Sequence, residues 1–127
     1  MQQSYQDLAL LAASQLAKEN SNLSYDFRWE NGTLVINPTE QRNKVAVGLD
    51  SVVVTDKGIE GADPLLVSLL EKAVLQVAHP NDAREIGFRN AMEGRPAIEG
   101  ISAAYAYGYE LGTQNRIPAA SDAKKTA

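Results

Sequence analysis

The chain opens with hydrophobic residues at helical spacing. Between residues 4 and 19 the larger apolar positions recur at intervals of three and four, with polar residues between them: Leu8, Leu11, Ala12 and Leu16. This spacing places the apolar side chains on one face, so it predicts an amphipathic helix over residues 4–19. The polar run of residues 20–22 is expected to end that helix.

A period of two replaces the helical period directly after this run. Three aromatic residues alternate with charged ones: Tyr25, Phe27 and Trp29. Asn31-Gly32 follows, and this pair favours the type I′ turn of a two-residue β-hairpin. We therefore expect a strand with a buried aromatic face, a tight turn, and a returning strand over residues 33–37.

The next segment is expected to add strands to the same sheet. Residues 38–43 are polar and begin with proline, so they are interpreted as a loop. Valine and leucine alternate over residues 45–49, and residues 52–54 are a β-branched run. These two runs form either a second hairpin around Asp50 or one long strand with a bulge near Gly48.

A strongly apolar helix is predicted over residues 64–79. Asp63 supplies an N-cap acceptor, and Pro64 occupies the first helical position. Leucine, alanine and valine then recur at helical spacing, so this helix is expected to be the central one of the fold. The single histidine, His79, is interpreted as a cation near the C-terminal end of the helix dipole.

Two further helices are predicted, over residues 81–92 and 101–113. Asn81 or Asp82 is expected to cap the first helix and Gly94 to end it. Small residues stand four apart in both: Gly87 and Ala91, then Gly108 and Gly112. Glycine in a helix interior costs about 1 kcal/mol relative to alanine. Close approach of the two helix backbones, in a helical hairpin, is the reason we expect for this choice.

The order of these elements predicts the fold class. Strands and helices are segregated along the chain, which is typical of α+β proteins. We expect an N-terminal helix, a three- to four-stranded antiparallel sheet, a central apolar helix and a C-terminal helical hairpin. Residues 1–116 are predicted to form a single domain. Residues 117–127 are small, polar and interrupted by proline, so they are predicted to form a flexible tail.

Composition and charge narrow the classes of function. A net charge of −4 argues against binding to DNA or to an anionic membrane, because both need clustered lysine and arginine. The absence of cysteine excludes disulfides and thiolate metal sites. No signal peptide and no apolar stretch of bilayer-spanning length is found in the sequence, so we expect a cytoplasmic protein without membrane association.

The sequence carries no catalytic or cofactor signature. One histidine without cysteine is insufficient for a zinc site, and no glycine-rich phosphate loop follows a strand. A nucleophile–base pair is missing as well. We therefore expect a non-enzymatic protein with no cofactor and no metal ion. The scattered carboxylates leave a small hydrolase or isomerase as an alternative.

Candidate binding residues gather in the last two predicted helices. Arginine binds phosphate or carboxylate groups through its forked guanidinium, and aromatic rings stack on planar groups. The residues with this chemistry are Arg28 on the polar strand face, and Arg84, Phe88, Arg89, Asn90, Arg95, Tyr105 and Tyr109. In one interpretation they form a pocket for an anionic, planar ligand such as a nucleotide. In the other, the aromatic residues are core and the arginines pair with neighbouring glutamates.

Part of this segment resembles a known family. From Ala83 to Pro96 the spacing is Ala-x-x-x-Gly-Phe-x-x-Ala-x-x-Gly-Arg-Pro, and Tyr-Gly-Tyr-x-x-Gly follows at residues 107–112. Over residues 83–113 this pattern is similar to the helical hairpin of ribosome modulation factor and related short proteins. The resemblance implies two closely packed helices and, in that family, binding to the ribosome.

These observations favour a binding protein that acts by sequestration. We expect a homo-oligomer, a homodimer in particular, built through the glycine faces of the last two helices and an exposed strand edge. Its partner would be a host protein or a small anionic, nucleotide-like ligand, as for a phage or mobile-element accessory protein that inhibits host defence or removes a nucleotide signal. The alternatives are a ribosome- or RNA-associated regulator and a structural component of a virion.

Overall fold

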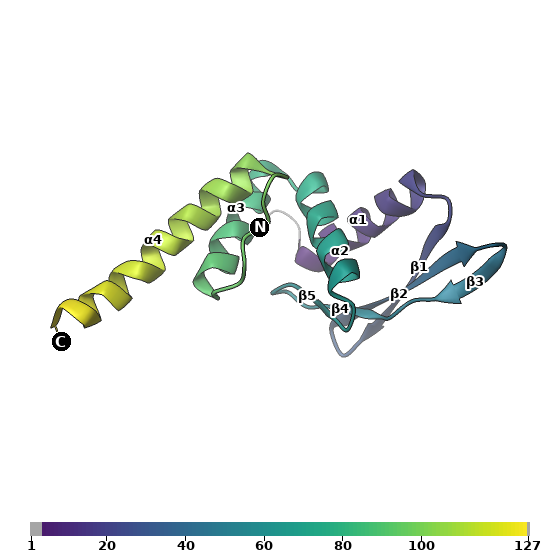
Figure 1. The fold of residues 1–127 in the computed structure, drawn as a ribbon, viewed down its shortest axis with the longest axis horizontal. Coiled ribbons are helices and arrows are strands. Elements are labelled where there is room, and N and C mark those ends of the chain that lie inside the picture. The colour runs from purple at the N-terminus through teal and green to yellow at the C-terminus, as the bar shows by residue number, and fades with distance from the viewer. Residues whose placement is uncertain (1–3, 127) are drawn as a thin grey trace. The chain divides into compact units, whose positions relative to one another are not determined.

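An N-terminal helix, an antiparallel sheet and three further helices follow one another along the chain (Figure 1), which confirms the predicted α+β class. The structure is a computed structural model that describes the backbone of residues 4–126 and the side chains of residues 4–116. The elements are α1 (Tyr5–Glu19), β1 (Leu23–Glu30), β2 (Thr33–Arg42), β3 (Val45–Gly48), β4 (Val52–Val54), β5 (Ile59–Gly61), α2 (Pro64–Val77), α3 (Pro80–Met92) and α4 (Ala103–Thr126).

The described chain divides into two compact units. One ends at Val77 and contains α1, the five strands and α2, and the other begins at Ala78 and contains α3 and α4. The single domain over residues 1–116 stays a prediction. The same holds for the flexible tail, because the side chains of residues 117–127 lie outside the described residues.

β2 is the strand around which the sheet is built. The strand order is β1-β2-β4-β5, and β3 pairs with β2 as well. Asn31 and Gly32 join β1 to β2 with φ angles of 51° and 77°, as a type I′ turn requires. The predicted hairpin is therefore confirmed, with Glu30 opposite Thr33.

The polar residues 38–42, which were predicted to be part of a loop, belong to β2. β2 runs through Pro38 to Arg42, and the turn lies at Asn43 and Lys44, whose φ angles are 51° and 66°. The prediction was wrong because proline and polar residues are typical of loops, whereas lysine gives little indication of a turn with positive φ.

β3 and β4 both pair with β2 and form the two parts of one returning strand. Gly48 lies opposite Thr39, and Val52 lies opposite Ile36. Gly48 and Val52 are four residues apart, whereas their partners on β2 are only three residues apart. One additional residue is accommodated between β3 and β4, as in a β-bulge. Of the two alternatives, the structure therefore favours the long strand with a bulge over the second hairpin.

The core of the first unit lies between one face of the sheet and the helices α1 and α2 (Figure 1). Its fully buried side chains come from both layers: Leu34, Ile36, Val52 and Val54 from the sheet, and Leu8, Ala12 and Val74 from the helices. Successive residues of a strand point to opposite faces. The register places Phe27 opposite Ile36 and Trp29 opposite Leu34, so the aromatic face of β1 is on the core side.

The aromatic face of β1 is nevertheless only partly covered. Phe27 is 39% exposed and Trp29 is 54% exposed, so the prediction of a buried aromatic face was wrong for these two residues. The sheet side chains that α1 and α2 bury completely lie on β2 and β4, whereas β1 is at the edge. Tyr25 is more enclosed, and its burial raises the pKa of its hydroxyl above the ordinary value of 10.0.

α2 begins as predicted but buries fewer apolar residues than expected. The Asp63 carboxylate accepts a hydrogen bond from the backbone N–H of Leu65 at 3.0 Å, which confirms the N-cap. Leu65 itself is 81% exposed, and Leu69 is also exposed. The residues that α2 buries lie in its later turns, from Leu70 onward.

α3 and α4 pack closely against each other, as the glycine pattern predicts. A Cβ atom added to Gly108 would lie 1.9 Å from the carbonyl oxygen of Arg84, and one added to Gly87 would lie 2.2 Å from that of Tyr105. Neither distance can accommodate a side chain, so glycine is required at both positions. The glycine faces are therefore used within one chain, which corrects the expectation that they build a dimer.

The two helices of this pair run in the same direction, whereas a helical hairpin would be antiparallel (Figure 1). Gly108 meets Arg84, Gly112 meets Phe88 four residues further on, and Gly94 at the end of α3 meets Arg116. The linker of residues 94–102 therefore returns along the pair before α4 begins. α4 then continues to Thr126, beyond its predicted end at residue 113.

His79 forms the N-terminal cap of α3. Its Nδ1 atom accepts a hydrogen bond from the backbone N–H of Asn81 at 3.1 Å, and Pro80 is the first helical residue. Two predictions were therefore wrong, because neither Asn81 nor Asp82 is the cap, and the His79 side chain caps the start of α3 instead of lying at the end of α2.

The end of α3 agrees with the sequence. Gly94 has a φ of 75°, and its N–H donates to the carbonyl of Ala91 at 3.1 Å, while the N–H of Arg95 donates to the carbonyl of Asn90 at 2.9 Å. These two bonds form a Schellman motif, in which the left-handed residue is usually glycine. Ser102 then caps α4, because its Oγ accepts from the N–H of Tyr105 at 3.1 Å.

Candidate functional site

A cleft of about 460 Å³ lies along one side of the α3–α4 pair. Its lining residues are Asn81, Asp82, Arg84, Glu85 and Phe88 from α3, and Gly108 and Leu111 from α4. Because residues three and four apart share a face of a helix, the polar groups and the ring of α3 face the cleft together. The cleft therefore combines one guanidinium, two carboxylates, one amide and one aromatic ring.

Gly108 explains why the two helices leave a cleft here. The α4 backbone comes so close to the carbonyl of Arg84 that position 108 has no room for a side chain. Nothing therefore projects from this position into the space beside Phe88, and Leu111 supplies the next apolar wall one turn later. The close packing of the helices thus also shapes the cleft.

The charged residues of the cleft differ in exposure. Arg84 is exposed, and its side chain has no hydrogen-bond or ion-pair partner within the described part of the chain. Asp82, in contrast, is only 1% exposed, and it lies in the first turn of α3, where the helix dipole favours a negative charge. The cleft therefore has a solvated positive group and a buried negative group.

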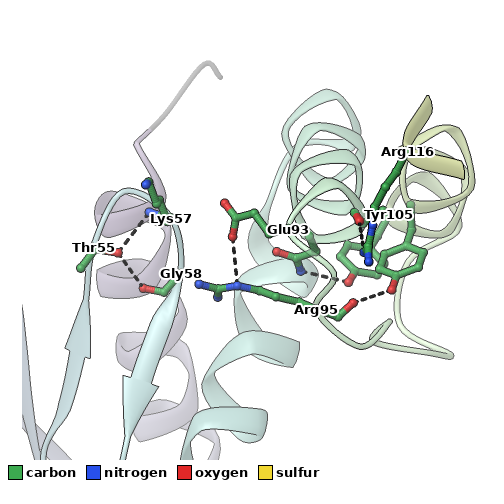
Figure 2. Close-up of polar contacts among 10 residues, drawn as sticks. Thr55, Lys57, Gly58, Glu93, Arg95, Tyr105 and Arg116 are labelled. Atoms are coloured by element: carbon green, nitrogen blue, oxygen red, sulfur yellow. Dashed lines mark hydrogen bonds and ion pairs between the residues drawn. The ribbon is translucent and has the colours of Figure 1, made fainter. Parts of the chain in front are cut away.

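Asn90 and Tyr105 belong to the interior of the pair and not to the cleft. Both are buried, and the Asn90 amide donates to the Tyr105 hydroxyl oxygen at 3.0 Å (Figure 2). The same oxygen accepts the backbone N–H of Ile98 at 3.3 Å. This polar contact ties the linker of residues 94–102 to the helices, so the two predicted site residues have a structural role.

Arg95 and Tyr109 also stabilise the linker. Arg95 Nε lies 3.0 Å from a carboxylate oxygen of Glu93, and the Tyr109 hydroxyl donates to the carbonyl of Arg95 (Figure 2). The rings of Tyr105 and Tyr109 lie 6.0 Å apart in a tilted arrangement. For these residues the structure agrees with the interpretation in which aromatic residues are core and arginine pairs with glutamate.

The two remaining predicted residues, Arg28 and Arg89, do not line the cleft. Arg28 lies on β1 in the first unit, where its Nε is 2.8 Å from a carboxylate oxygen of Glu30. Both side chains are more than half exposed, so this pair contributes little to stability. Arg89 lies on α3 outside the cleft lining. Of the eight predicted residues, only Arg84 and Phe88 line the cleft.

Five residues that line the cleft were not predicted from the sequence: Asn81, Asp82, Glu85, Gly108 and Leu111. Three of them were interpreted as helix caps or as a surface ion-pair partner, and Gly108 was assigned to helix packing alone. The usable signal was the spacing of positions 81, 85 and 88, which places them on one face of α3.

The described residues offer neither a metal site nor a membrane-spanning helix. No group of three or more histidine, aspartate or glutamate side chains among them is placed to hold a metal ion. None of the described helices is long and apolar enough to span a bilayer. No protein-family model, no curated protein and no solved structure matches this chain, so the function is argued from the cleft itself.

Proposed function

We propose that the chain is a binding protein whose cleft takes a small planar molecule with one anionic group, such as a nucleoside monophosphate. The observation that carries this proposal is the Arg84 guanidinium, which is exposed, has no partner among the described residues, and lines the same cleft as the ring of Phe88. An arginine in this setting can form two parallel hydrogen bonds to two oxygens of a phosphate or carboxylate group.

The other walls of the cleft suit a nucleobase. The Phe88 ring offers an apolar face for stacking, and Leu111 extends it. The exposed carboxylate of Glu85 accepts hydrogen bonds from N–H groups, such as those on the Watson–Crick edge of guanine. The carboxylates of Asp82 and Glu85 both repel additional negative charge. The cleft therefore favours a monophosphate over a di- or triphosphate.

The proposed role is to hold the ligand without changing it. Among the described residues that line the cleft, Asp82 and Glu85 are the only ionisable acids, and none is serine, cysteine, histidine or lysine. Nucleophilic catalysis usually needs such a residue next to a base. Binding of this kind would act by sequestration, and it predicts that the ligand is recovered intact after denaturation, whereas an enzyme would release product.

The first test is native mass spectrometry of the full chain purified from a bacterial host, followed by denaturation and analysis of what is released. We expect a small anion at a stoichiometry of one per chain. Calorimetric titration with GMP, AMP and GTP then tests the chemistry, and we expect GMP to bind more tightly than GTP. A chain that carries no small molecule and binds none of these probes would overturn the proposal.

Two matched variants test the role of Arg84. Arg84→Gln and Arg89→Gln remove the same charge from the same helix, but only Arg84 lines the cleft. Loss of a hydrogen bond to a charged group predicts that Arg84→Gln weakens GMP binding by about tenfold or more. Arg89→Gln is expected to leave it within about twofold. Equal losses in the two variants would contradict the assignment of the cleft.

Ribosome or RNA association is the second proposal for function, and it is supported by the sequence resemblance alone. Residues 78–116 contain four arginines, five acidic residues and no lysine. This segment is therefore not a basic surface, which RNA binding ordinarily needs. The cleft supports the small-ligand proposal better.

A further inference from the structure

β1 leaves a long edge of the sheet open. Among the described strands it pairs with β2 alone, over its whole length of eight residues. Phe27 and Trp29 are substantially exposed on one face of this strand, and Arg28 and Glu30 are more than half exposed on the other. An exposed edge strand presents unpaired backbone groups that can bind another strand.

The hydrogen-bond pattern identifies the backbone groups that face this edge. In an antiparallel ladder, alternate residue pairs exchange hydrogen bonds, and the residues between them direct their backbone groups to the other side. The N–H of Gln41 donates to the carbonyl of Asn22 at 2.8 Å. Every second residue after Asn22 repeats this pattern, so the backbone groups of Asp26 and Arg28 also form hydrogen bonds with β2. The N–H and carbonyl of Phe27 therefore face the open edge.

The charges on β1 discriminate among the ways in which two copies can pair. Asp26, Arg28 and Glu30 lie on one face and alternate in sign. With Phe27 opposite position 25 of a second copy, Asp26 faces Asp26, and with Phe27 opposite position 29, Arg28 faces Arg28. With Phe27 opposite Phe27, each Asp26 faces an Arg28, and opposite charges across strands are stabilising.

A register centred on Trp29 also pairs opposite charges, because Arg28 then faces Glu30. It overlaps only residues 28–30 of each strand, since β1 ends at Glu30 and the Asn31-Gly32 turn follows. The register centred on Phe27 overlaps residues 24–30, so it forms more backbone hydrogen bonds. It also brings Tyr25 opposite Trp29 of the second copy, and aromatic pairs of this kind add stability.

We propose that the β1 edge is the binding surface for a second copy of this chain. The two β1 strands pair antiparallel around a two-fold axis at Phe27, with two Asp26–Arg28 ion pairs on one face and the aromatic residues on the other. The surface is isologous, as in most homodimers. It lies in the first unit, so it is independent of the cleft and of the function proposed for the cleft.

The first experiment measures the oligomeric state of the full chain by light scattering and sedimentation over a dilution series. We expect a dimer that dissociates on dilution. Trp29 is the single tryptophan of the chain, so a change in its fluorescence is expected to accompany dissociation. A monomer at every concentration would overturn the proposal.

Charge reversal tests the surface specifically. Asp26→Arg places two arginines opposite each other in the proposed register, and Arg28→Asp places two aspartates opposite each other. Each variant alone is expected to be folded by circular dichroism and monomeric by light scattering and sedimentation. Mixing the two variants restores both ion pairs, so a heterodimer is expected, and the double variant Asp26→Arg/Arg28→Asp is expected to form a homodimer. Single variants that stay dimeric, or a mixture that stays monomeric, would overturn the proposal.

Cysteine cross-linking tests the register, because the chain has no cysteine of its own. In the proposed register the two Phe27 positions are directly opposite, at about 5.5 Å between Cα atoms, which is within disulfide range. The two Trp29 positions are four residues apart along the strands, about 14 Å at 3.4 Å per residue. Phe27→Cys is therefore expected to cross-link on mild oxidation and Trp29→Cys is not. The opposite result would overturn the register.

Discussion

The imidazole of His79 caps the start of α3. Its Nδ1 accepts the N–H of Asn81, and His79 is exposed and directly precedes the first helical residue, Pro80. Residues that accept such a bond stabilise a helix because they satisfy a backbone donor that has no partner within the helix. Histidine can fill this position only while the accepting nitrogen is free of a proton.

The cap can be tested by two substitutions of His79. His79→Ala removes the acceptor, so we expect the free energy of unfolding to fall by about 1 kcal/mol. His79→Asp keeps an acceptor and adds a negative charge near the positive end of the helix dipole, so stability is expected to equal or exceed that of the native chain. Urea denaturation followed by circular dichroism measures both. Equal stabilities for the alanine and aspartate variants would contradict the role of the cap.

At the level of single residues, sequence chemistry identified some of the cleft but could not place every side chain. Arg84 and Phe88 have the chemistry of a binding site and do line the cleft. Asn90 and Tyr105 have the same chemistry but bond to each other in the interior. Which polar residues are buried together depends on the direction and contact face of two helices, and residue types alone do not determine either.

The contact between α3 and α4 depends on backbone packing at glycine. Intrinsic helix propensity and packing make opposite predictions for alanine at Gly108. Alanine stabilises an isolated helix by about 1 kcal/mol relative to glycine, but here its Cβ would lie 1.9 Å from the carbonyl oxygen of Arg84. A backbone atom cannot move aside as a flexible side chain can, so packing is expected to dominate.

We therefore expect Gly108→Ala to destabilise the chain by about 2 kcal/mol or more, as overpacking does in a close-packed contact. Gly48→Ala is the matched control, because no atom lies within 4 Å of the added Cβ and its φ is not positive. Thermal denaturation of the two variants beside the native chain gives the comparison. A Gly108→Ala variant as stable as the native chain would show that the helices can separate without loss.

In the sheet, the position of the first hairpin turn could be predicted from the sequence, but the length of β2 could not. The type I′ turn at Asn31-Gly32 was predictable because both residues favour positive φ. The length of β2 was not, because Pro38 is expected to end a strand. The carbonyl of Pro38 accepts a hydrogen bond from the N–H of Leu49 at 2.9 Å, so the backbone groups of Pro38 face away from β1. The missing N–H therefore breaks no bond to β1, but only the pairing partners reveal this.

For the whole molecule, the charge distribution distinguishes the two proposed kinds of partner. The chain has 12 basic and 16 acidic residues, and the described part of the second unit has one more acidic residue than basic ones. A protein that binds RNA through its phosphates releases counterions, so its affinity falls steeply with salt. A chain without a basic surface lacks this contribution, whereas a cleft with one arginine can still hold one phosphate.

We therefore expect the full chain not to co-sediment with ribosomes at either about 50 or about 200 mM salt, the range over which phosphate contacts lose most of their affinity. Glu99→Lys/Glu110→Lys is a useful control, since both residues are exposed and the reversals turn residues 78–116 from one net negative charge to three net positive charges. This variant should gain a weak, salt-sensitive association. Association of the native chain at low salt that disappears at high salt would contradict the prediction and support the resemblance to the ribosome-binding family.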